Sequence, residues 1–185
     1  MVILYDNNPS MLDKAKTGLN KILNSLEEKG KIQSAKEILD RIVFASNLSA
    51  FEGCGLIIEA IVENLAVKQQ LFSDLEKLVS ADCILATNTS SLSVTLIASS
   101  CANPERVIGI HFFNPAPLMP LVEIIPAVQT DNKITDQSKK LIDGWGKTTV
   151  LAKDTPGFIV NRVARPFYGE AIRIYEEGFC DYATI

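Results

Sequence analysis

Short runs of apolar residues alternate along this chain with segments of helical periodicity, and this alternation constrains the fold more than any other feature. The first run, Val2–Tyr5, shows no alternation of apolar and polar residues, which is typical of a parallel strand covered on both faces. Because strands that alternate with helices form β-α-β units, the sequence predicts an α/β fold with an open, doubly wound parallel sheet. The expected strands are Val2–Tyr5, Ile42–Ala45, Leu56–Glu59, Cys83–Ala86, Val107–Ile110, Leu121–Ile125 and Thr148–Leu151.

Helices are expected between the strands and after the last one. Asn8-Pro9 is typical of a helix start and Gly30 of a helix end, and Asn64 is expected to cap another helix. The final helical segment, 159–177, carries apolar side chains on more than one face, so it needs a packing partner on each side. The expected helices are 10–29, 35–40, 65–79, 93–99, 136–145 and 159–177.

Composition excludes several classes of protein. Of the 185 residues, 47% are apolar, which excludes a disordered chain. The net charge of −4 provides no basic surface for nucleic acid or for an anionic membrane, and no apolar run is long enough to cross a bilayer, so neither partner is expected. With no export signal, one histidine and no Cys-x-x-Cys pair, the chain is expected to be a reduced cytoplasmic protein without a metal site.

Asp6 follows directly after the first expected strand. In a dinucleotide-binding fold, an acid at the tip of the second strand accepts hydrogen bonds from the adenine-ribose hydroxyls and favours NAD over NADP. The same carboxylate could instead cap the helix that follows, and on the strand alone capping is the better interpretation. The ten glycines include no Gly-x-Gly-x-x-Gly loop. Such a loop precedes the acid by about 20 residues, so it would lie before residue 1.

His111 is the strongest single candidate for a catalytic group. It is expected on a loop after the strand Val107–Ile110, and the carboxyl ends of parallel strands are where such sheets place ligands. An imidazole titrates near neutrality, so it can take a proton from a substrate hydroxyl. Glu123 lies within the apolar run Leu121–Ile125, where a buried carboxylate needs a partner, and the only histidine is the best candidate. Two alternatives remain open, namely a loop histidine bound to backbone groups and an exposed glutamate on an edge strand.

Two further segments place polar side chains at the ends of expected elements. The segment 88–91, Asn-Thr-Ser-Ser, follows a strand, and its side chains could hydrogen-bond a substrate oxygen or a nicotinamide ribose. The alternative is that Ser91 or Ser93 caps the next helix. Asn161 falls in the first turn of the last helix, from which it could reach back to a site or lie in solvent.

These segments belong to longer motifs that occur in a fixed order. The motifs are Asn88-Thr-Ser-Ser-Leu92, Gly109-Ile-His-Phe-Phe-Asn-Pro115 and Asp154-Thr-Pro-Gly-Phe-Ile-Val-Asn-Arg162, together with Glu59-Ala-Ile-Val-Glu63 and Lys68. In order and spacing, across essentially the whole chain, they resemble the 3-hydroxyacyl-CoA dehydrogenase family. The segment HFFNPAPLMPLVEI is most similar to the bacterial 3-hydroxybutyryl-CoA dehydrogenases of aromatic-acid and fatty-acid breakdown.

The resemblance implies oxidation of an (S)-3-hydroxyacyl-CoA to the 3-oxoacyl-CoA, with hydride transfer to NAD⁺. It implies that His111 is the catalytic base and Glu123 its pairing carboxylate. It also implies that Ser90 and Asn161 hydrogen-bond the reacting part of the substrate. The positions that match the family's NAD site are Asp6, Glu63, Lys68, Ser90 and Asn114.

The resemblance also sets an expectation for the domains. Residues 1–153 would form a Rossmann-type NAD-binding domain, and 154–185 would begin an all-helical domain through which the full-length protein forms a homodimer. Family members start with a βα unit that holds the glycine-rich loop, so the chain is expected to be truncated at both ends and not to turn over at a normal rate in this form. The alternative is a non-catalytic binding or structural fragment of the same fold. Other β-hydroxyacid dehydrogenases are disfavoured because they commonly use a lysine base.

Overall fold

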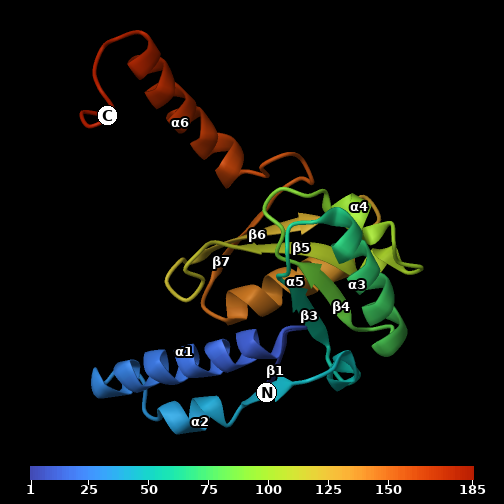
Figure 1. Ribbon diagram of the computed structural model, residues 1–185. Coiled ribbons are helices and arrows are strands. Elements are labelled where there is room, and N and C mark those ends of the chain that lie inside the picture. Colours follow the sequence, from blue (N-terminus) through green and yellow to red (C-terminus); the bar gives the residue numbers. More distant parts are fainter. The chain divides into compact units, whose positions relative to one another are not determined.

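The strands of the chain form two hydrogen-bonded sheets (Figure 1). The computed structural model describes residues 1–185, which divide into two compact units, Met1–Cys54 and Gly55–Ile185. The α/β architecture is confirmed: the first unit has a sheet of two strands and the second has a sheet of five. No helix is both long enough and apolar enough to span a membrane.

The first unit is built around two parallel strands, β1 (Val2–Tyr5) and β2 (Ile42–Ala45). Between them lie α1 (Pro9–Glu28) and α2 (Ala35–Leu39), and the short 3-10 helix η1 (Leu48–Phe51) follows β2. The predicted helix signals are confirmed: the Asn8 side chain accepts a hydrogen bond from the Ser10 amide, and Gly30 adopts φ +65° just after α1. Only glycine adopts that conformation without strain, so it ends the helix.

The second unit contains a five-stranded sheet in the order β3-β4-β5-β6-β7. Its strands are β3 (Leu56–Glu59), β4 (Ile84–Thr87), β5 (Val107–Phe112), β6 (Leu121–Pro126) and β7 (Thr148–Leu151). Its helices are α3 (Leu65–Leu78), α4 (Val94–Ala98), η2 (Pro104–Arg106), α5 (Asn132–Gly144) and α6 (Val160–Glu176). The predicted cap of α3 is confirmed, because the Asn64 side chain accepts a hydrogen bond from the Val67 amide.

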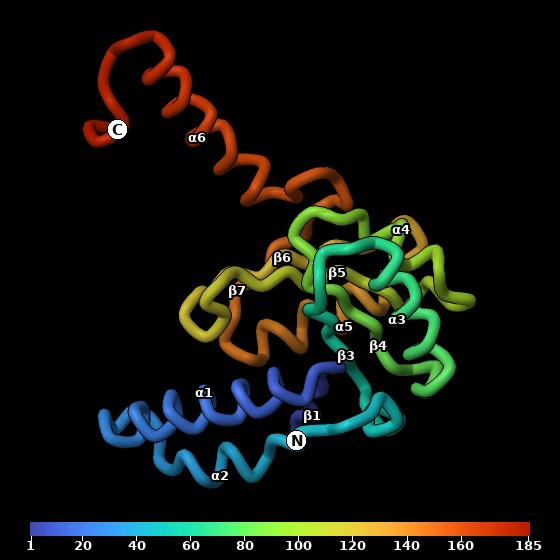
Figure 2. The backbone as a smooth tube through the Cα atoms, viewed as in Figure 1, coloured from blue at the N-terminus to red at the C-terminus, as the bar shows by residue number.

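The two faces of this sheet are covered by different helices, as the backbone path in Figure 2 shows. Alternate residues of the central strands, among them Ile108, Ile110 and Ile124, form one buried cluster with Ile142 of α5. The intervening residues face α4, where Val94 lies against the sheet at Gly109. Because successive side chains of a strand point to opposite faces, residues 111 and 123 share the α4 face with Gly109.

The pairing of β5 with β6 is antiparallel, whereas the sequence analysis predicted a parallel sheet. The connection 113–120 contains no helix, and so short a segment cannot return the chain to the start of a parallel strand. The other pairs, β3–β4, β4–β5 and β6–β7, are parallel. Helix α5 also begins earlier than predicted, at Asn132, because the Asp131 side chain accepts a hydrogen bond from the Lys133 amide and caps it.

Gly109 allows α4 to pack closely on the sheet. A Cβ atom at this position would lie 2.9 Å from both Ile125 Cβ and Val94 Cγ2. We therefore expect Gly109→Ala to lower the free energy of unfolding by about 1–3 kcal/mol, measured by urea unfolding, because the core must shift to accept the methyl group. The control is Gly144→Ala in α5, where an added Cβ meets nothing within 4 Å. Equal stability of the two variants would contradict this packing.

Candidate active site

A buried histidine–glutamate pair lies on the α4 face of the sheet. In the antiparallel register, His111 of β5 stands directly opposite Glu123 of β6, and His111 Nδ1 lies 2.8 Å from Glu123 Oε2. The exposed fractions of the two residues are 5% and 0%. The prediction that His111 lies on a loop after the strand was wrong, because the pairing with β6 extends β5 through Phe112. His111 and Glu123 therefore both have their backbones held in paired strands.

Glu123 is also bonded to the beginning of α6. Its Oε1 accepts hydrogen bonds from the backbone amides of Ile159 and Val160, both at 2.9 Å. These amides belong to the first turn of α6, whose N-cap residue makes no side-chain cap of its own. A carboxylate is favoured there because the free amides of a helix start carry partial positive charge. The alternative of an exposed glutamate on an edge strand is excluded, since β6 lies between β5 and β7.

Two aromatic rings enclose the imidazole. The ring centroids of Phe113 and Phe158 lie 4.6 Å and 5.7 Å from that of His111. Phe158 adopts φ +46° after Gly157 at φ +77°, a conformation that costs a bulky residue about 1–3 kcal/mol and that occurs most often near functional sites. A carboxylate next to Nδ1 favours the neutral tautomer that carries its proton on Nδ1, which leaves the lone pair on Nε2.

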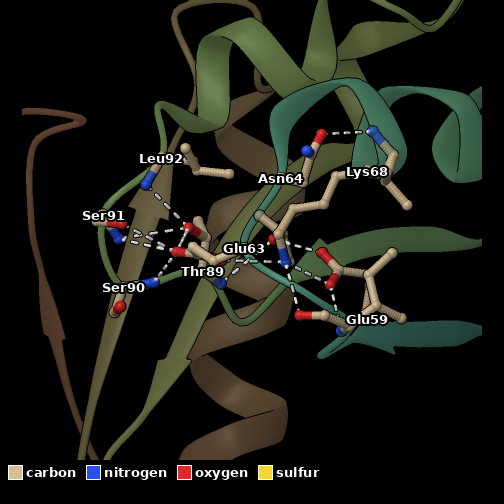
Figure 3. Close-up of polar contacts among 11 residues, drawn as sticks. Glu59, Glu63, Asn64, Lys68, Thr89, Ser90, Ser91 and Leu92 are labelled. Carbon is tan, nitrogen blue, oxygen red and sulfur yellow. Dashed lines mark hydrogen bonds and ion pairs between the residues drawn. The ribbon is translucent and has the colours of Figure 1, made fainter.

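A second cluster holds the Ser90 turn, which we define as residues 88–92 (Figure 3). Glu63 Oε1 accepts hydrogen bonds from the Thr89 hydroxyl at 2.5 Å and from the Ser90 amide at 3.0 Å. It also accepts from the amide and the hydroxyl of Ser91, at 3.2 and 3.1 Å. One carboxylate oxygen thus binds three successive residues of the turn, and Ser90 itself is exposed at its tip.

These contacts strongly favour the charged form of Glu63. Burial opposes ionisation, but the hydrogen bonds from Thr89 and Ser90 and the charge of Lys68 outweigh it and lower the pKa of Glu63 to about 2. The carboxylate is therefore ionised at neutral pH, and it anchors the Ser90 turn through charge-assisted hydrogen bonds.

Glu59, which the sequence analysis gave no role, lies beneath this cluster. Its Oε1 accepts hydrogen bonds from Lys68 Nζ at 2.5 Å and from the Ile61 amide at 2.6 Å, and its Oε2 accepts from the Thr87 hydroxyl at 2.8 Å. Lys68 Nζ also lies 3.2 Å from Glu63 Oε2. Lys68 is only 1% exposed. The lysine therefore lies between two carboxylates, as Figure 3 shows.

The loop that leads into α6 brings two more polar residues to this region. Asn161 lies in the first turn of α6, as predicted, and its Nδ2 approaches the Ser90 carbonyl oxygen at 3.5 Å. Asp154 accepts hydrogen bonds at the start of α4 from the Ser93 hydroxyl and from the amides of Val94 and Thr95. Burial opposes its ionisation, but the hydrogen bonds from Thr95 and Ser93 outweigh it and lower the pKa of Asp154.

The two remaining predicted site residues are both exposed. Asn114 is exposed beyond the end of β5. Asp6 is exposed directly after β1 in the first unit, and its Oδ1 accepts a hydrogen bond from the Asn8 amide. The cap of α1 is Asn8 and not Asp6, so the capping interpretation of Asp6 was wrong. The structure thus brings His111 together with Glu123, and Lys68 with Glu63, Ser90 and Asn161, while the roles assigned to these residues stay predictions.

Protonation of the Glu63 carboxylate at low pH should weaken its hydrogen bonds to the Ser90 turn and so lower the stability of the fold. Because the pKa of Glu63 is about 2 in the folded chain and 4.5 ordinarily, its contribution to stability is fully present above pH 4.5 and is lost as the pH falls through about 2. We expect the free energy of unfolding of the wild type to exceed that of Glu63→Gln most above pH 4.5. The difference should shrink on acidification in urea titrations. A constant difference down to pH 2 would contradict an ionised anchor.

Comparison with known proteins relates this chain to a defined family. The family described as "3-hydroxyacyl-CoA dehydrogenase, NAD binding domain" matches residues 1–155. The chain is 44% identical to the 3-hydroxyadipyl-CoA dehydrogenase of Escherichia coli over 95% of its length. It is 41% identical over its whole length to a probable 3-hydroxybutyryl-CoA dehydrogenase of Deinococcus radiodurans.

A solved structure agrees with these matches. The (S)-3-hydroxybutyryl-CoA dehydrogenase PaaH1 of Ralstonia eutropha superposes with a TM-score of 0.94 at 31% identity and covers 99% of this chain. The chain spans 38% of the E. coli relative, 66% of the Deinococcus relative and 65% of the Ralstonia structure. It therefore corresponds to part of each of these proteins.

Proposed function

This chain belongs to the 3-hydroxyacyl-CoA dehydrogenase NAD binding domain family, and from that premise we propose that the whole protein oxidises (S)-3-hydroxyacyl-CoA esters to 3-oxoacyl-CoA esters. The observation that carries the proposal is the buried contact of 2.8 Å between His111 Nδ1 and Glu123 Oε2. An imidazole bonded through one nitrogen to a carboxylate is arranged to accept a proton at the other.

In this proposal His111 is the general base. Its Nε2 removes the proton of the 3-hydroxyl group, and Glu123 stabilises the imidazolium that forms, because the carboxylate already accepts the Nδ1 hydrogen. Phe113 and Phe158 limit the access of water to the ring. Glu123 is a positioning residue, since both of its oxygens are bonded within the protein.

Ser90 and Asn161 are proposed to hold the reacting part of the substrate. The Ser90 side chain is exposed at the tip of its turn, while the backbone beneath it is fixed by Glu63. The Asn161 amide lies next to the same turn. A hydroxyl and a carboxamide are suited to hydrogen-bond the 3-oxygen and the thioester carbonyl, and so to orient the substrate for His111.

NAD⁺, the cofactor of this family, supplies the hydride acceptor when it is bound. The chemistry of Asp6 fits the adenine ribose, because its exposed carboxylate directly follows a parallel strand. Of its two oxygens, Oδ1 accepts a hydrogen bond from the Asn8 amide, and Oδ2 is the one proposed to accept from the ribose. We propose that Asp6 binds the ribose hydroxyls, that Glu63, Ser90 and Asn114 line the nicotinamide end of the site, and that Lys68 belongs to the same site.

The proposal is tested with the full-length protein. Addition of NAD⁺ and (S)-3-hydroxybutyryl-CoA should produce NADH, measured by its absorbance, whereas the (R) enantiomer serves as the control and should give little signal. The reverse reaction with acetoacetyl-CoA should consume NADH. Absence of turnover with all short- and medium-chain esters, in a protein that is folded and binds NAD⁺, would instead support a non-catalytic binding role.

Helix α6 exposes apolar side chains that bear on how the full-length protein assembles. Val163, Phe167, Tyr168 and Ile172 of α6 are exposed and apolar, and the relatives named above are longer than this chain. We propose that residues from 154 onward begin a helical domain which covers this surface and through which the full-length protein forms a homodimer. Size-exclusion chromatography with light scattering would detect the dimer.

A further inference from the structure

The segment that connects β7 to α6 begins and ends against the same strand, β6. We define this segment, residues 152–159, as the entry loop. Its first residue, Ala152, is buried, and the Ala152 amide donates a hydrogen bond of 2.9 Å to the Ile124 carbonyl oxygen. Its last residue, Ile159, donates its amide to Glu123 Oε1. Both ends of the entry loop are therefore bonded to neighbouring residues of β6.

Between these ends, Asp154 bonds the entry loop to the start of α4. Its Oδ2 accepts hydrogen bonds from the Ser93 hydroxyl and the Thr95 amide, both at 2.8 Å, and its Oδ1 accepts from the Val94 amide at 3.0 Å. Burial opposes ionisation of this carboxyl group, but the hydrogen bonds from Thr95 and Ser93 lower the pKa of Asp154. The carboxylate is therefore charged at neutral pH, and its three bonds are charge-assisted.

The part of the entry loop between Asp154 and α6 has a strained backbone. Gly157 has φ +77° and Phe158 has φ +46°, and the second value is unfavourable for a bulky side chain. Such a conformation persists only where the surrounding structure holds it. The Phe158 amide donates a hydrogen bond of 2.9 Å to the carbonyl oxygen of Thr155, which directly follows Asp154. A displacement of Asp154 is therefore expected to reach Phe158.

Two groups of the candidate site depend on this part of the chain. The Phe158 side chain is buried against His111, with 5.7 Å between the ring centroids. Asn161 follows in the first turn of α6, and its Nδ2 approaches the Ser90 carbonyl oxygen at 3.5 Å. Asp154 itself bonds the residue that directly follows the Ser90 turn. It thus joins the loop that carries Phe158 to the turn that carries Ser90.

We propose that Asp154 is a positioning residue for the reaction. Its carboxylate holds the entry loop on the start of α4. Through the loop it keeps the Phe158 ring against His111, and through the first turn of α6 it keeps Asn161 next to the Ser90 turn. This inference rests on the proposed function for its kinetic part, whereas its structural part concerns only residues of this chain.

The test variant is Asp154→Asn in the full-length protein. Both carboxylate oxygens of Asp154 are acceptors, so the NH₂ group of asparagine faces a donor in either orientation and at least one hydrogen bond is lost. The matched control is Asp131→Asn. Asp131 also caps a helix, α5, but it accepts only with Oδ1, from the Lys133 amide, and asparagine caps a helix equally well.

Amide hydrogen exchange tests the structural part of the proposal. Asp154→Asn should speed the exchange of residues 94–95, whose amides lose a charged acceptor. It should also make the exchange of residues 159–160 about tenfold faster, because the loop that presents these amides to Glu123 is no longer held on α4. Asp131→Asn should leave both pairs of amides at their wild-type rates.

Two further measurements report on the candidate site. The imidazole proton resonances of His111, assigned by their loss in His111→Gln, should shift in Asp154→Asn, because an aromatic ring alters the resonances of nearby protons and the Phe158 ring moves. In steady-state kinetics at saturating substrates, kcat should fall about 10- to 100-fold, as expected for slightly misplaced reacting groups. Asp131→Asn should keep the wild-type resonances and the wild-type kcat.

A different pattern would overturn the proposal. If only residues 94–95 exchange faster, while residues 159–160 and the His111 resonances keep their wild-type values, Asp154 only caps α4. Faster exchange of residues 159–160 with an unchanged kcat would likewise refute the positioning role. If the wild type shows no turnover, the proposed function fails, and the exchange rates and resonances still decide whether Asp154 holds the loop.

A second variant keeps the test decisive if Asp154→Asn does not fold. Ser93→Ala deletes one of the three donors to Asp154 and leaves the carboxylate in place. It should shift the exchange of residues 159–160 and the His111 resonances in the same direction by a smaller amount. Wild-type values of both in Ser93→Ala would then refute the proposal.

Discussion

Replacing His111 by glutamine in the full-length protein is expected to lower kcat by about 10²–10⁴-fold, the usual contribution of a general base. Glutamine keeps the approximate size of the side chain, and its amide can still donate a hydrogen bond to Glu123 Oε2, so the buried carboxylate keeps a partner. It has no group that accepts a proton near neutral pH. The measurement is steady-state turnover of (S)-3-hydroxybutyryl-CoA at saturating NAD⁺.

The control measurement checks that the His111→Gln variant is folded. The thermal unfolding midpoint and the circular dichroism spectrum should stay close to those of the wild type, since β5 and its pairing with β6 remain. A decrease in kcat of less than about tenfold in a folded variant would remove His111 from the proton-transfer step.

The second large effect is expected for Glu123→Gln. The glutamine carbonyl can replace Oε1 as acceptor for the amides of Ile159 and Val160, which turns its NH₂ group toward His111 Nδ1. That arrangement places the proton on Nε2, where the substrate needs an acceptor. The corresponding change in a serine-protease triad lowers kcat about 10⁴-fold, and we expect a loss of about 10³-fold or more in kcat here.

The matched control is Glu105→Gln, the same chemical change at an exposed residue of η2. It should leave kcat and stability at their wild-type values. Glu123→Gln should remain folded, because glutamine has the size of glutamate and keeps the hydrogen bonds to α6. Unchanged kinetics of Glu123→Gln would show that the carboxylate does not orient the imidazole.

The elements that the sequence predicted best are those with local signals. Asn8, Asn64 and Gly30 mark helix ends through their own side chain or backbone, and the structure confirms all three. The contact between His111 and Glu123 could also be anticipated, because a carboxylate in an apolar run needs a partner and the chain has a single histidine.

What the sequence analysis missed depends on contacts between segments that are distant in sequence. The antiparallel pairing of β5 with β6 follows from the lack of a crossover in 113–120, and the length of that connection was the available signal. Glu59 shares the strand parity of the buried Ile57, and Lys68 shares the helix face of Phe72. Two opposite charges at core positions predict a buried ion pair, but only the fold shows which segments supply them.

Glu123 contacts both His111 and the start of α6, and this links the position of the helix to that of the histidine. One carboxylate bridges the imidazole and the first turn of α6, which also carries Asn161. If that turn lifted from the sheet, the buried oxygen would lose two donors, and the residue proposed to orient the substrate would depart in the same movement. Seating of the helix and the hydrogen bonding of the carboxylate are therefore coupled, so that in the proposed mechanism the base is fully oriented only while this turn contacts the sheet.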